Sequence, residues 1–382
     1  MRLENPSFSK ANWISRAISG SSSTIKISMP ETINPVREPF SNETIRIILS
    51  NYGFNSTSYL ALESDKKHFF HQKVFAVTAY ANFNKVAITA GEPICPRDAL
   101  GIAIDEFLEF TQQQRLQPLF FEVTESVTPV LQQRGFHLLK LGEEPFFELD
   151  KFTLKGNKMA NVRSSGKTAQ KRGVKVREYY PTDPEALLIN PQLEAISHQW
   201  LETRGISELS FTLGTLSLDQ PGDRRYFIAE QGNKVVAFLT YSPIYARQGV
   251  YLDLMRRSDD APTGTMDLLL SESFQLLHKA GVKLVTMGMS PLANVQNCSI
   301  NQSKHLAWLL YKFSVYGKSF YHFEQMHGFK RKFQPHFWES KYLAYRSLGF
   351  REMDAIMSAL LRQNISRLVW QILNQPIYFK FL

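Results

Sequence analysis

Cysteine is scarce in this 382-residue chain, which contains only Cys95 and Cys298, far apart in the sequence. Two such residues make neither a disulfide framework nor a zinc site, and they indicate a reducing compartment. The N-terminal stretch MRLENPSFSKANWISR lacks the apolar core of a secretory signal, and no apolar run approaches the ~20 residues of a membrane-spanning helix. We therefore expect a cytoplasmic chain that is soluble or peripheral to a membrane.

Several motifs that carry chemistry are also missing. The sequence contains neither GxxxxGK[ST] nor GxGxxG, which disfavours a fold that binds nucleoside triphosphates or dinucleotides. It also lacks the GxSxG elbow of hydrolases. His68 and His71 are close in sequence, but no carboxylate or cysteine completes a metal-ligand spacing around them. We expect no metal site and no bound cofactor.

Positive charge is what the chain has in excess, with a formal net charge of +9. Residues 151–177 contain no Asp or Glu and nine cations, which equal the whole net charge: Lys151, Lys155, Lys158, Arg163, Lys167, Lys171, Arg172, Lys175 and Arg177. The segment is either a solvated linker or a positive face, and residues 157–171 have a helical pattern that lines up cations. Such a face suits nucleic-acid phosphates and anionic lipid headgroups equally.

The apolar periodicity predicts an α+β chain in which one order of elements occurs twice. Residues 1–40, rich in Ser, Asn and Pro, are expected to form a flexible N-terminal arm. The stretches YLALE and KVFAVTAYANFNKVAITAG are predicted strands, followed by helix, strand, helix and strand. A three-strand meander, a helix and a strand then recur, which predicts two domains, 41–150 and 151–350. Residues 351–382 are predicted to be an amphipathic helix and tail, which packs on its own domain or lies on a membrane surface.

The order of meander, helix and strand is similar to the acetyltransferase-type (GNAT) fold. That superfamily holds the pyrophosphate of coenzyme A with a Q/R-x-x-G-x-G/A loop before its main helix. Neither corresponding junction, ITAGEPICPRDALG or RRSDDAPTGTMD, has this loop. Asp259 and Asp260 would repel a pyrophosphate. We expect a GNAT-like fold whose acyl donor is not coenzyme A.

The strand YLDLMRR ends in a carboxylate and a guanidinium, Asp253 and Arg256. Alternation along a strand puts these two side chains on opposite faces, unless the strand ends there. Together they can orient an amine and a phosphate, and the competing interpretation is a surface ion pair.

A lysine-rich stretch, FEQMHGFKRKFQPHFWESKYLAY at 323–345, supplies the most specific pattern. With DKFTLKGNKMANVRSSGKTAQKRGV, WLETRGISELSFTLGTLS, YLDLMRRSDDAPTGTMDLLL and GMSPLANV, it resembles the cytosolic catalytic domain of the phosphatidylglycerol lysyltransferases and alanyltransferases, the multiple peptide resistance factor family. The matching pieces span about 150–346. The resemblance covers that domain without the multi-helix flippase module that family members often carry.

This resemblance implies two tandem GNAT-like units that transfer an amino acid, lysyl or alanyl, from aminoacyl-tRNA to a hydroxyl of phosphatidylglycerol. Aminoacyl-tRNA is then a co-substrate, and the protein works at the inner face of the cell membrane, alone or with a membrane partner. Asp253, Arg256 and Glu324 match catalytic positions, with the general base unassigned. Residues implied for lipid phosphate or tRNA are Lys330, Lys332, Trp338, Glu339, Lys155, Arg163, Lys171 and Arg172.

Two departures from the family pattern leave the substrate open. Ser340 replaces the expected proline, and PLANV replaces the usual PLSGL. One alternative is a GNAT-fold acyltransferase with another acceptor or donor. The other is a non-catalytic module that binds RNA or membrane, in which Asp253 and Glu324 can be replaced without loss.

Overall fold

The computed structural model describes residues 42–204, 211–295 and 323–361. The predicted arm at 1–40 lies outside these residues. The elements before residue 150 are α2 (Asn42–Tyr52), η1 (Ser58–Leu62), β1 (Lys67–Phe70), β2 (Val77–Phe83), β3 (Val86–Ala90), η2 (Arg97–Ala99), α3 (Leu100–Gln113), β4 (Gln117–Thr124), η3 (Glu125–Val127), α4 (Thr128–Gln132) and β5 (His137–Glu148). Those after it are η4 (Asn157–Met159), α5 (Ala160–Lys171), β6 (Val174–Tyr179), α6 (Ala186–Arg204), β7 (Arg225–Gln231), β8 (Lys234–Ile244), η5 (Tyr245–Arg247), β9 (Gly249–Arg257), α7 (Thr265–Lys279), β10 (Leu284–Thr286), β11 (Ser290–Pro291), α9 (Phe323–Arg331), β12 (Phe337–Tyr345) and α10 (Phe350–Leu361).

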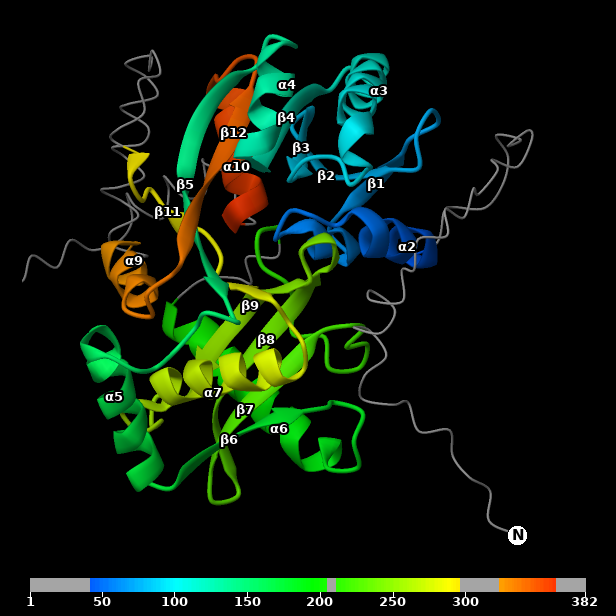
Figure 1. Ribbon diagram of the computed structural model, residues 1–382. Coiled ribbons are helices and arrows are strands. Elements are labelled where there is room, and N and C mark those ends of the chain that lie inside the picture. Colours follow the sequence, from blue (N-terminus) through cyan, green and yellow to red (C-terminus); the bar gives the residue numbers. More distant parts are fainter. Residues whose placement is uncertain (1–41, 205–210, 296–322, 362–382) are drawn as a thin grey trace, which may run out of the picture.

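The strands form one twelve-stranded mixed sheet with helices on both faces (Figure 1). Their order is β1-β2-β3-β4-β12-β5-β10-β9-β8-β7-β6, and β11 pairs with β5. The predicted mixture of helices and strands is therefore confirmed, as a single sheet. The domain boundary near residue 150 stays a prediction.

The two ends of this sheet share one pairing scheme. At one end, β2 and β3 are antiparallel, and α3 leads into β4, which is parallel to β3. At the other end, β8 and β9 are antiparallel, and α7 leads into β10, which is parallel to β9. We call these ends the N-terminal half (β1–β4) and the C-terminal half (β6–β10).

The last strand of the described chain lies at the centre of the sheet. β12 pairs with β4 on one side and with β5 on the other, antiparallel to both. β5 in turn pairs with β10 through Phe146–Glu148, so β5 and β12 run side by side from one half toward the other (Figure 1). This arrangement brings the lysine-rich stretch at 323–345 against strands that precede residue 150.

Apolar side chains fill both faces of the sheet. In the N-terminal half, Phe107 of α3 packs with Phe120 on one face, and Ile356 of α10 packs with Ile88 on the other. In the C-terminal half, α5 and α7 share a cluster with Phe147 and Phe274, and α6 covers the opposite face. Such burial is the main source of the stability of a sheet covered by helices.

Two sequence predictions change in the structure. YLALE is mostly the 3-10 helix η1 and not a strand, because the N–H groups of Leu60 and Glu63 bond to carbonyls three residues earlier, at 3.0 and 3.1 Å, and not to a neighbouring strand. The predicted C-terminal amphipathic helix is not confirmed: within α10, residues 352–359 are all buried, so this part has no polar solvent face. Residues 362–382 lie outside the described residues.

Across the described ranges, no helix combines the length and the apolar character that crossing a membrane requires.

Candidate functional site

Buried charged side chains gather where β4, β5, β9 and β12 meet the segment that follows α2. We distinguish two groups, both made of residues from distant parts of the sequence. The Glu144 cluster consists of Asn55, Ser56, Glu92, Glu122, Glu144, Thr286, Lys330 and Lys341. The Asp253 cluster consists of Glu63, Gly214, Thr215, Arg224, Ser242 and Asp253. Buried polar groups of this kind are stable only when they are paired.

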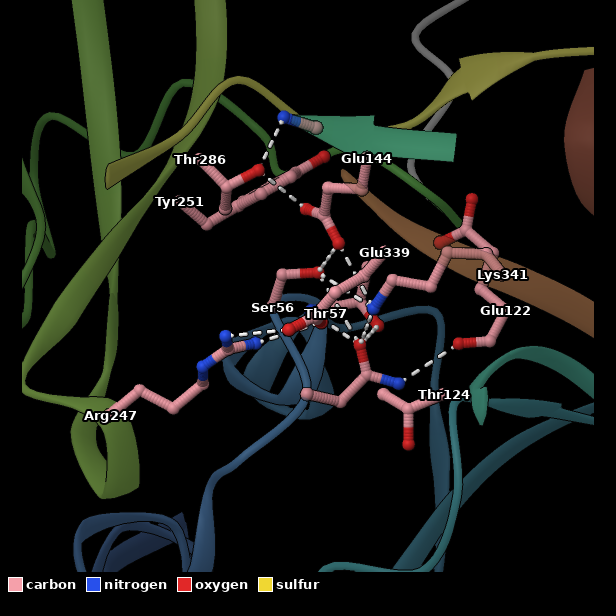
Figure 2. A network of polar contacts seen from close by, with 12 residues as sticks. Ser56, Thr57, Glu122, Thr124, Glu144, Arg247, Tyr251, Thr286, Glu339 and Lys341 are labelled. Carbon is pink, nitrogen blue, oxygen red and sulfur yellow. Dashed lines mark hydrogen bonds and ion pairs between the residues drawn. The ribbon is translucent and has the colours of Figure 1, made fainter. Parts of the chain in front are cut away.

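Glu144 lies at the centre of the first cluster (Figure 2). Ser56 Oγ donates a hydrogen bond to its Oε2 at 2.9 Å, and Thr286 Oγ1 donates to its Oε1 at 2.8 Å. Lys341 Nζ forms an ion pair with Oε2 at 3.0 Å, and both charged side chains are at most 2% exposed. The carboxylate is therefore held by partners from three separate elements.

Lys341 also connects Glu144 to a second chain of polar contacts. Its Nζ donates to Asn55 Oδ1 at 2.7 Å, and Asn55 Nδ2 donates to Glu92 Oε2 at 2.7 Å and to the carbonyl of Glu122 at 2.9 Å. The carboxylate of Glu92 accepts a further bond from Thr124 Oγ1 at 2.8 Å. These side-chain contacts thus join three parts of the molecule: strand β4, strand β12 and the segment that follows α2. Few of the polar atoms involved are left without a partner.

Glu122 reaches this cluster through an irregularity in β4. The pairing of β4 with β12 shifts register between Tyr342 and Ala344, so that Phe121 and Glu122 face one residue of β12. The φ angle of Glu122 is +59°, a left-handed conformation that side-chain-bearing residues seldom adopt. Such bulges redirect a side chain, and backbone strain of this kind gathers at functional sites.

Glu122 and Lys330 are both poised to titrate near neutrality. Burial raises the pKa of the Glu122 carboxyl to about 7, although the nearby Lys341 and Lys330 act in the opposite direction. Burial lowers the pKa of the Lys330 ammonium to about 7, against the pull of Glu144 and Glu122. Lys330 Nζ donates to the carbonyls of Gly288 and Met289, at 2.8 and 2.9 Å. An acid and a base with pKa values near the working pH are suited to proton transfer.

Asp253 is the buried carboxylate of the second cluster. The backbone N–H of Gly214 donates to its Oδ1 at 2.5 Å, and Ser242 Oγ donates to its Oδ2 at 3.0 Å. Arg224 Nε lies 3.9 Å from Oδ2. Burial raises the pKa of Asp253, while Arg224 and the two hydrogen bonds hold it down.

A second register shift affects β9 at Asp253. The pairing of β8 with β9 shifts between Thr240 and Tyr241, so Asp253 is the extra residue between Leu252 and Leu254. Leu252 packs in the cluster with α7, whereas Leu254 packs in the cluster with α6. The sequence predicted that Asp253 and Arg256 would lie on opposite faces of the strand, and the bulge changes this. Asp253 contacts Gly214, which follows α6, and Arg256 stacks 5.2 Å from the ring of Trp200 on α6.

Tyr251 lies between the two clusters. Its hydroxyl donates to the carbonyl of Thr212 at 3.3 Å, and its ring lies against Gly288. Burial raises its pKa well above the usual value, with further contributions from Asp253, Glu122 and Glu144. Residues of both clusters therefore raise the pKa of Tyr251, so the two clusters are neighbours in one region of the molecule.

The other predicted residues of the lysine-rich stretch are spread around this region. Lys332 pairs with Asp267 at the start of α7 and lies 4.2 Å from the ring of Phe329, away from Lys330. Trp338 packs edge-on against His327, with ring centroids 4.7 Å apart.

Glu339 belongs to a separate ion pair at the edge of this region. It accepts two bonds from Arg247, at 2.7 and 3.0 Å (Figure 2). Arg247 also stacks 4.2 Å from the ring of Phe146. The side chain of Glu324 lies outside the described residues.

The predicted positive face runs over and beside α5: three of its nine cations lie on the helix, Arg163, Lys167 and Lys171, while Lys155 lies before the helix and Arg172 directly after it. Lys155, Lys171 and Arg172 are exposed, and no acidic side chain of the described residues forms an ion pair with them. Arg163 instead donates to the carbonyls of Leu154 and, at 2.6 Å, of Gly156, which fixes the turn before the helix. The helix predicted at 157–171 is confirmed as η4 and α5.

Sequence reasoning missed most of the two clusters. Asn55, Glu92 and Glu122 carry no motif, and Glu144 stands in a run of acidic and apolar residues. The one usable signal was Lys341, a cation directly before the apolar stretch YLAY of the lysine-rich segment. A charge in a buried strand needs a partner, which is a reason to look for one. Within the described ranges no three His, Cys, Asp or Glu residues form a group that could hold a metal.

Comparison with known proteins identifies relatives across most of this fold. Residues 46–345 match the family described as "Phosphatidylglycerol lysyltransferase, C-terminal". The phosphatidylglycerol lysyltransferase of Bacillus subtilis (strain 168) is 30% identical over 315 residues, which are 82% of this chain and 36% of that protein. The one from Staphylococcus haemolyticus (strain JCSC1435) is 27% identical over 307 residues, 78% of this chain and 35% of that protein. The chain thus spans little more than a third of the length of these relatives.

Solved structures show the same fold. The structure of L-PGS from Bacillus licheniformis superposes with a TM-score of 0.73 at 27% identity, covering 88% of this chain and 99% of that one. The C-terminal domain of a putative lysylphosphatidylglycerol synthetase from Agrobacterium fabrum gives 0.71 at 25% identity, covering 83% and 96%. The family match at residues 46–345 contains both buried clusters.

Proposed function

Because this chain belongs to the phosphatidylglycerol lysyltransferase C-terminal family, we propose that it transfers an amino acid from aminoacyl-tRNA to a hydroxyl of phosphatidylglycerol. The observation that carries the proposal is the family match at residues 46–345, which contains both buried clusters. We propose lysine as the first donor to test, because the relatives are named lysyltransferases, and alanine as the second. The product would carry an added amine, which lowers the negative charge of the lipid.

The reaction is a transesterification. The oxygen of the lipid hydroxyl forms a new ester bond to the aminoacyl carbonyl carbon, and the bond from that carbon to the tRNA ribose oxygen breaks. The hydroxyl proton ends on the ribose oxygen. Because the aminoacyl ester is already activated, the proposal calls for no cofactor besides aminoacyl-tRNA, and the protein contributes positioning and proton transfer.

Asp253 is our candidate for the aminoacyl amine. Three charged side chains of its cluster are at most 6% exposed: the carboxylates of Asp253 and Glu63 and the guanidinium of Arg224. Two negative charges and one positive charge leave the cluster with one negative charge in excess. Buried charges are stable when paired, so this cluster favours a cationic group such as the α-ammonium of the donor.

Lys330 is our candidate for the general base. A neutral amine has two N–H bonds, and the carbonyls of Gly288 and Met289 accept two, which leaves one lone pair. Its pKa, lowered to about 7, allows this neutral form at the working pH. Lys330 would take the proton of the lipid hydroxyl and return it to the ribose oxygen, a role different from the phosphate binding that the resemblance implied.

The remaining predicted residues keep supporting roles in this proposal. Arg256, on the face of Asp253, is assigned to the phosphate side of the donor, and Glu324 to the neighbourhood of the aminoacyl amine. Lys332 and Trp338 are assigned to the lipid, and Glu339 to holding Arg247. The exposed cations on and beside α5, Lys155, Lys171 and Arg172, would hold tRNA phosphates or anionic headgroups and keep the protein at the inner membrane surface.

We also propose that the two halves of the sheet are GNAT-like units. The support is their shared scheme of an antiparallel pair, a helical crossover and a parallel strand. The candidate site lies where the halves meet, along β5 and β12.

The test is transfer of radiolabelled lysine from lysyl-tRNA into chloroform-extractable lipid, with vesicles that contain phosphatidylglycerol. We expect label in the lipid, its loss when the donor is first treated with RNase, and a drop of about 100-fold or more in Asp253→Asn. Vesicles without phosphatidylglycerol are the control for the acceptor. Binding of both tRNA and vesicles without any transfer, for lysine and alanine alike, would instead favour a non-catalytic binding module.

A further inference from the structure

A buried ion triad links the segment after η1 to the carboxylate that we assign to the donor amine. Arg224, in the loop before β7, donates through Nη2 to Glu63 Oε1, and both side chains are at most 6% exposed. The other edge of the same guanidinium, Nε, is directed toward Asp253 Oδ2 at 3.9 Å. One guanidinium therefore faces two carboxylates that come from opposite halves of the molecule.

The Nε atom of Arg224 is buried and makes no hydrogen bond, although a buried N–H normally has a partner. At 3.9 Å it interacts with Asp253 through charge alone. The neighbouring Arg225, by contrast, forms a two-bond pair with Glu178 at 2.6 and 2.7 Å. Arg224 is thus placed to act on the charge of Asp253.

Glu63 fixes this placement. Besides Arg224, it accepts a hydrogen bond from Thr215 Oγ1 at 2.9 Å and one from the Thr215 N–H at 3.4 Å. Thr215 follows Gly214, whose N–H binds Asp253. The same carboxylate therefore holds both the guanidinium and the loop that reach Asp253.

We propose that Arg224, held by Glu63, is a positioning residue that keeps Asp253 ionised and oriented for the ammonium of the aminoacyl donor. This inference rests on the proposed function, because it takes the donor amine as the ligand of Asp253. It also gives the N-terminal half a direct effect on donor binding, through Glu63.

Arg224 and Glu63 have opposite electrostatic effects on Asp253. Arg224 lowers the pKa of Asp253, and Glu63 raises it. The other titratable groups that face Asp253 are tyrosines: Tyr251 on its own strand, Tyr226 on β7 and, across Arg224, Tyr59 on η1. Burial raises the pKa of Tyr251 and of Tyr226, so those two remain neutral over the acidic range.

The experiment measures the dissociation constant of a lysyl-tRNA analogue, with an amide in place of the ester, at pH 4.5 to 8. We expect binding to weaken as the pH falls and Asp253 becomes protonated. In Arg224→Gln the midpoint should move to higher pH, and in Glu63→Gln to lower pH, with affinity at pH 7 at least 5-fold weaker in Arg224→Gln. Arg225→Gln, which removes an adjacent guanidinium paired with Glu178, is the control and should leave the midpoint in place.

The outcomes separate this inference from the function on which it rests. Opposite shifts of the midpoint support the triad, because a merely structural role would weaken both variants without moving it. Analogue binding with an unmoved midpoint in both variants overturns the role of Arg224 and leaves the proposed function intact. Failure of the wild-type protein to bind the analogue overturns the proposed function itself. If Arg224→Gln does not fold, as judged by its thermal unfolding, Arg224→Lys replaces it and should give a smaller shift in the same direction.

Discussion

Lysines occupy two contrasting regions of this molecule. Lys330 and Lys341 are buried at the junction of the two halves of the sheet, next to Glu122 and Glu144. Lys155, before α5, and Lys171, at its end, are exposed to solvent in a segment without acidic residues. A buried ammonium depends on the carboxylate beside it, whereas an exposed one acts through the field of the whole surface. The first pair should therefore govern folding and chemistry, and the second should govern affinity for polyanions.

The largest effect is expected from Lys341→Met. Removing this ammonium leaves Glu144 buried with only the hydroxyls of Ser56 and Thr286. Breaking a buried pair on one side costs about 3–5 kcal/mol of unfolding free energy. Urea unfolding measures the loss, with Lys171→Met on α5 as the exposed control, expected within about 0.5 kcal/mol of wild type. Equal stability of the two variants would contradict the contrast between the regions.

A smaller loss is expected when the loop over Asp253 is crowded. A Cβ at Gly214 would lie 2.9 Å from Cγ of Asp253. Gly214→Ala should therefore displace the carboxylate, destabilise the protein by about 1–3 kcal/mol and reduce lipid aminoacylation. Gly328→Ala on α9, where a Cβ meets nothing within 4 Å, is the matched control. Full activity of Gly214→Ala would show that the position of Asp253 is not critical.

The pH dependence of stability tests the environment of Glu122. Its folded pKa is raised from 4.5 to about 7. Between these values the folded state binds a proton that the unfolded state releases, so this group's contribution to stability falls as the pH rises. Glu122→Gln removes the effect. The unfolding free energy of wild type minus that of the variant should decline from pH 4.5 to 7, and a flat difference would argue for an ordinary carboxylate.

The smallest effect on folding is expected from the α5 face. Replacing Lys155, Lys171 and Arg172 by Ala removes three exposed cations and should change the unfolding free energy by no more than about 0.5 kcal/mol. Affinity for tRNA should fall, and the slope of its logarithm against that of salt should decrease by about 1 for each lost phosphate contact. An unchanged salt slope would show that these cations contact no phosphate of the tRNA.

The same contrast explains what the sequence could predict. The helix at 157–171 and its cations were predictable, because periodicity and charge counting are local. The strands of KVFAVTAYANFNKVAITAG, which are β2 and β3, and the helix after them, α3, were predictable for the same reason. The pairing of β12 between β4 and β5 was not, because it depends on contacts between residues roughly 200 positions apart.

The candidate site follows from that long-range pairing. Asp253 was selected from a motif, but its bulge, its Gly214 cradle and its triad with Arg224 and Glu63 come from three distant segments. Glu122 owes its position to a bulge in the pairing of β4 with β12, a strand more than 200 residues later in the chain. Lys330 was selected from the lysine-rich stretch, and its burial beside two carbonyls gives it a different proposed role.

The most direct test of the contrast is the single-turnover rate of transfer at saturating lysyl-tRNA. Lys330→Met, which removes the buried amine, is compared with the triple α5 variant. We predict that Lys330→Met slows transfer by about 100-fold or more even at saturation, whereas the α5 variant reaches the wild-type rate once enough donor is present. A wild-type rate in Lys330→Met, or a loss in the α5 variant that saturation does not restore, would contradict the division between buried chemistry and exposed binding.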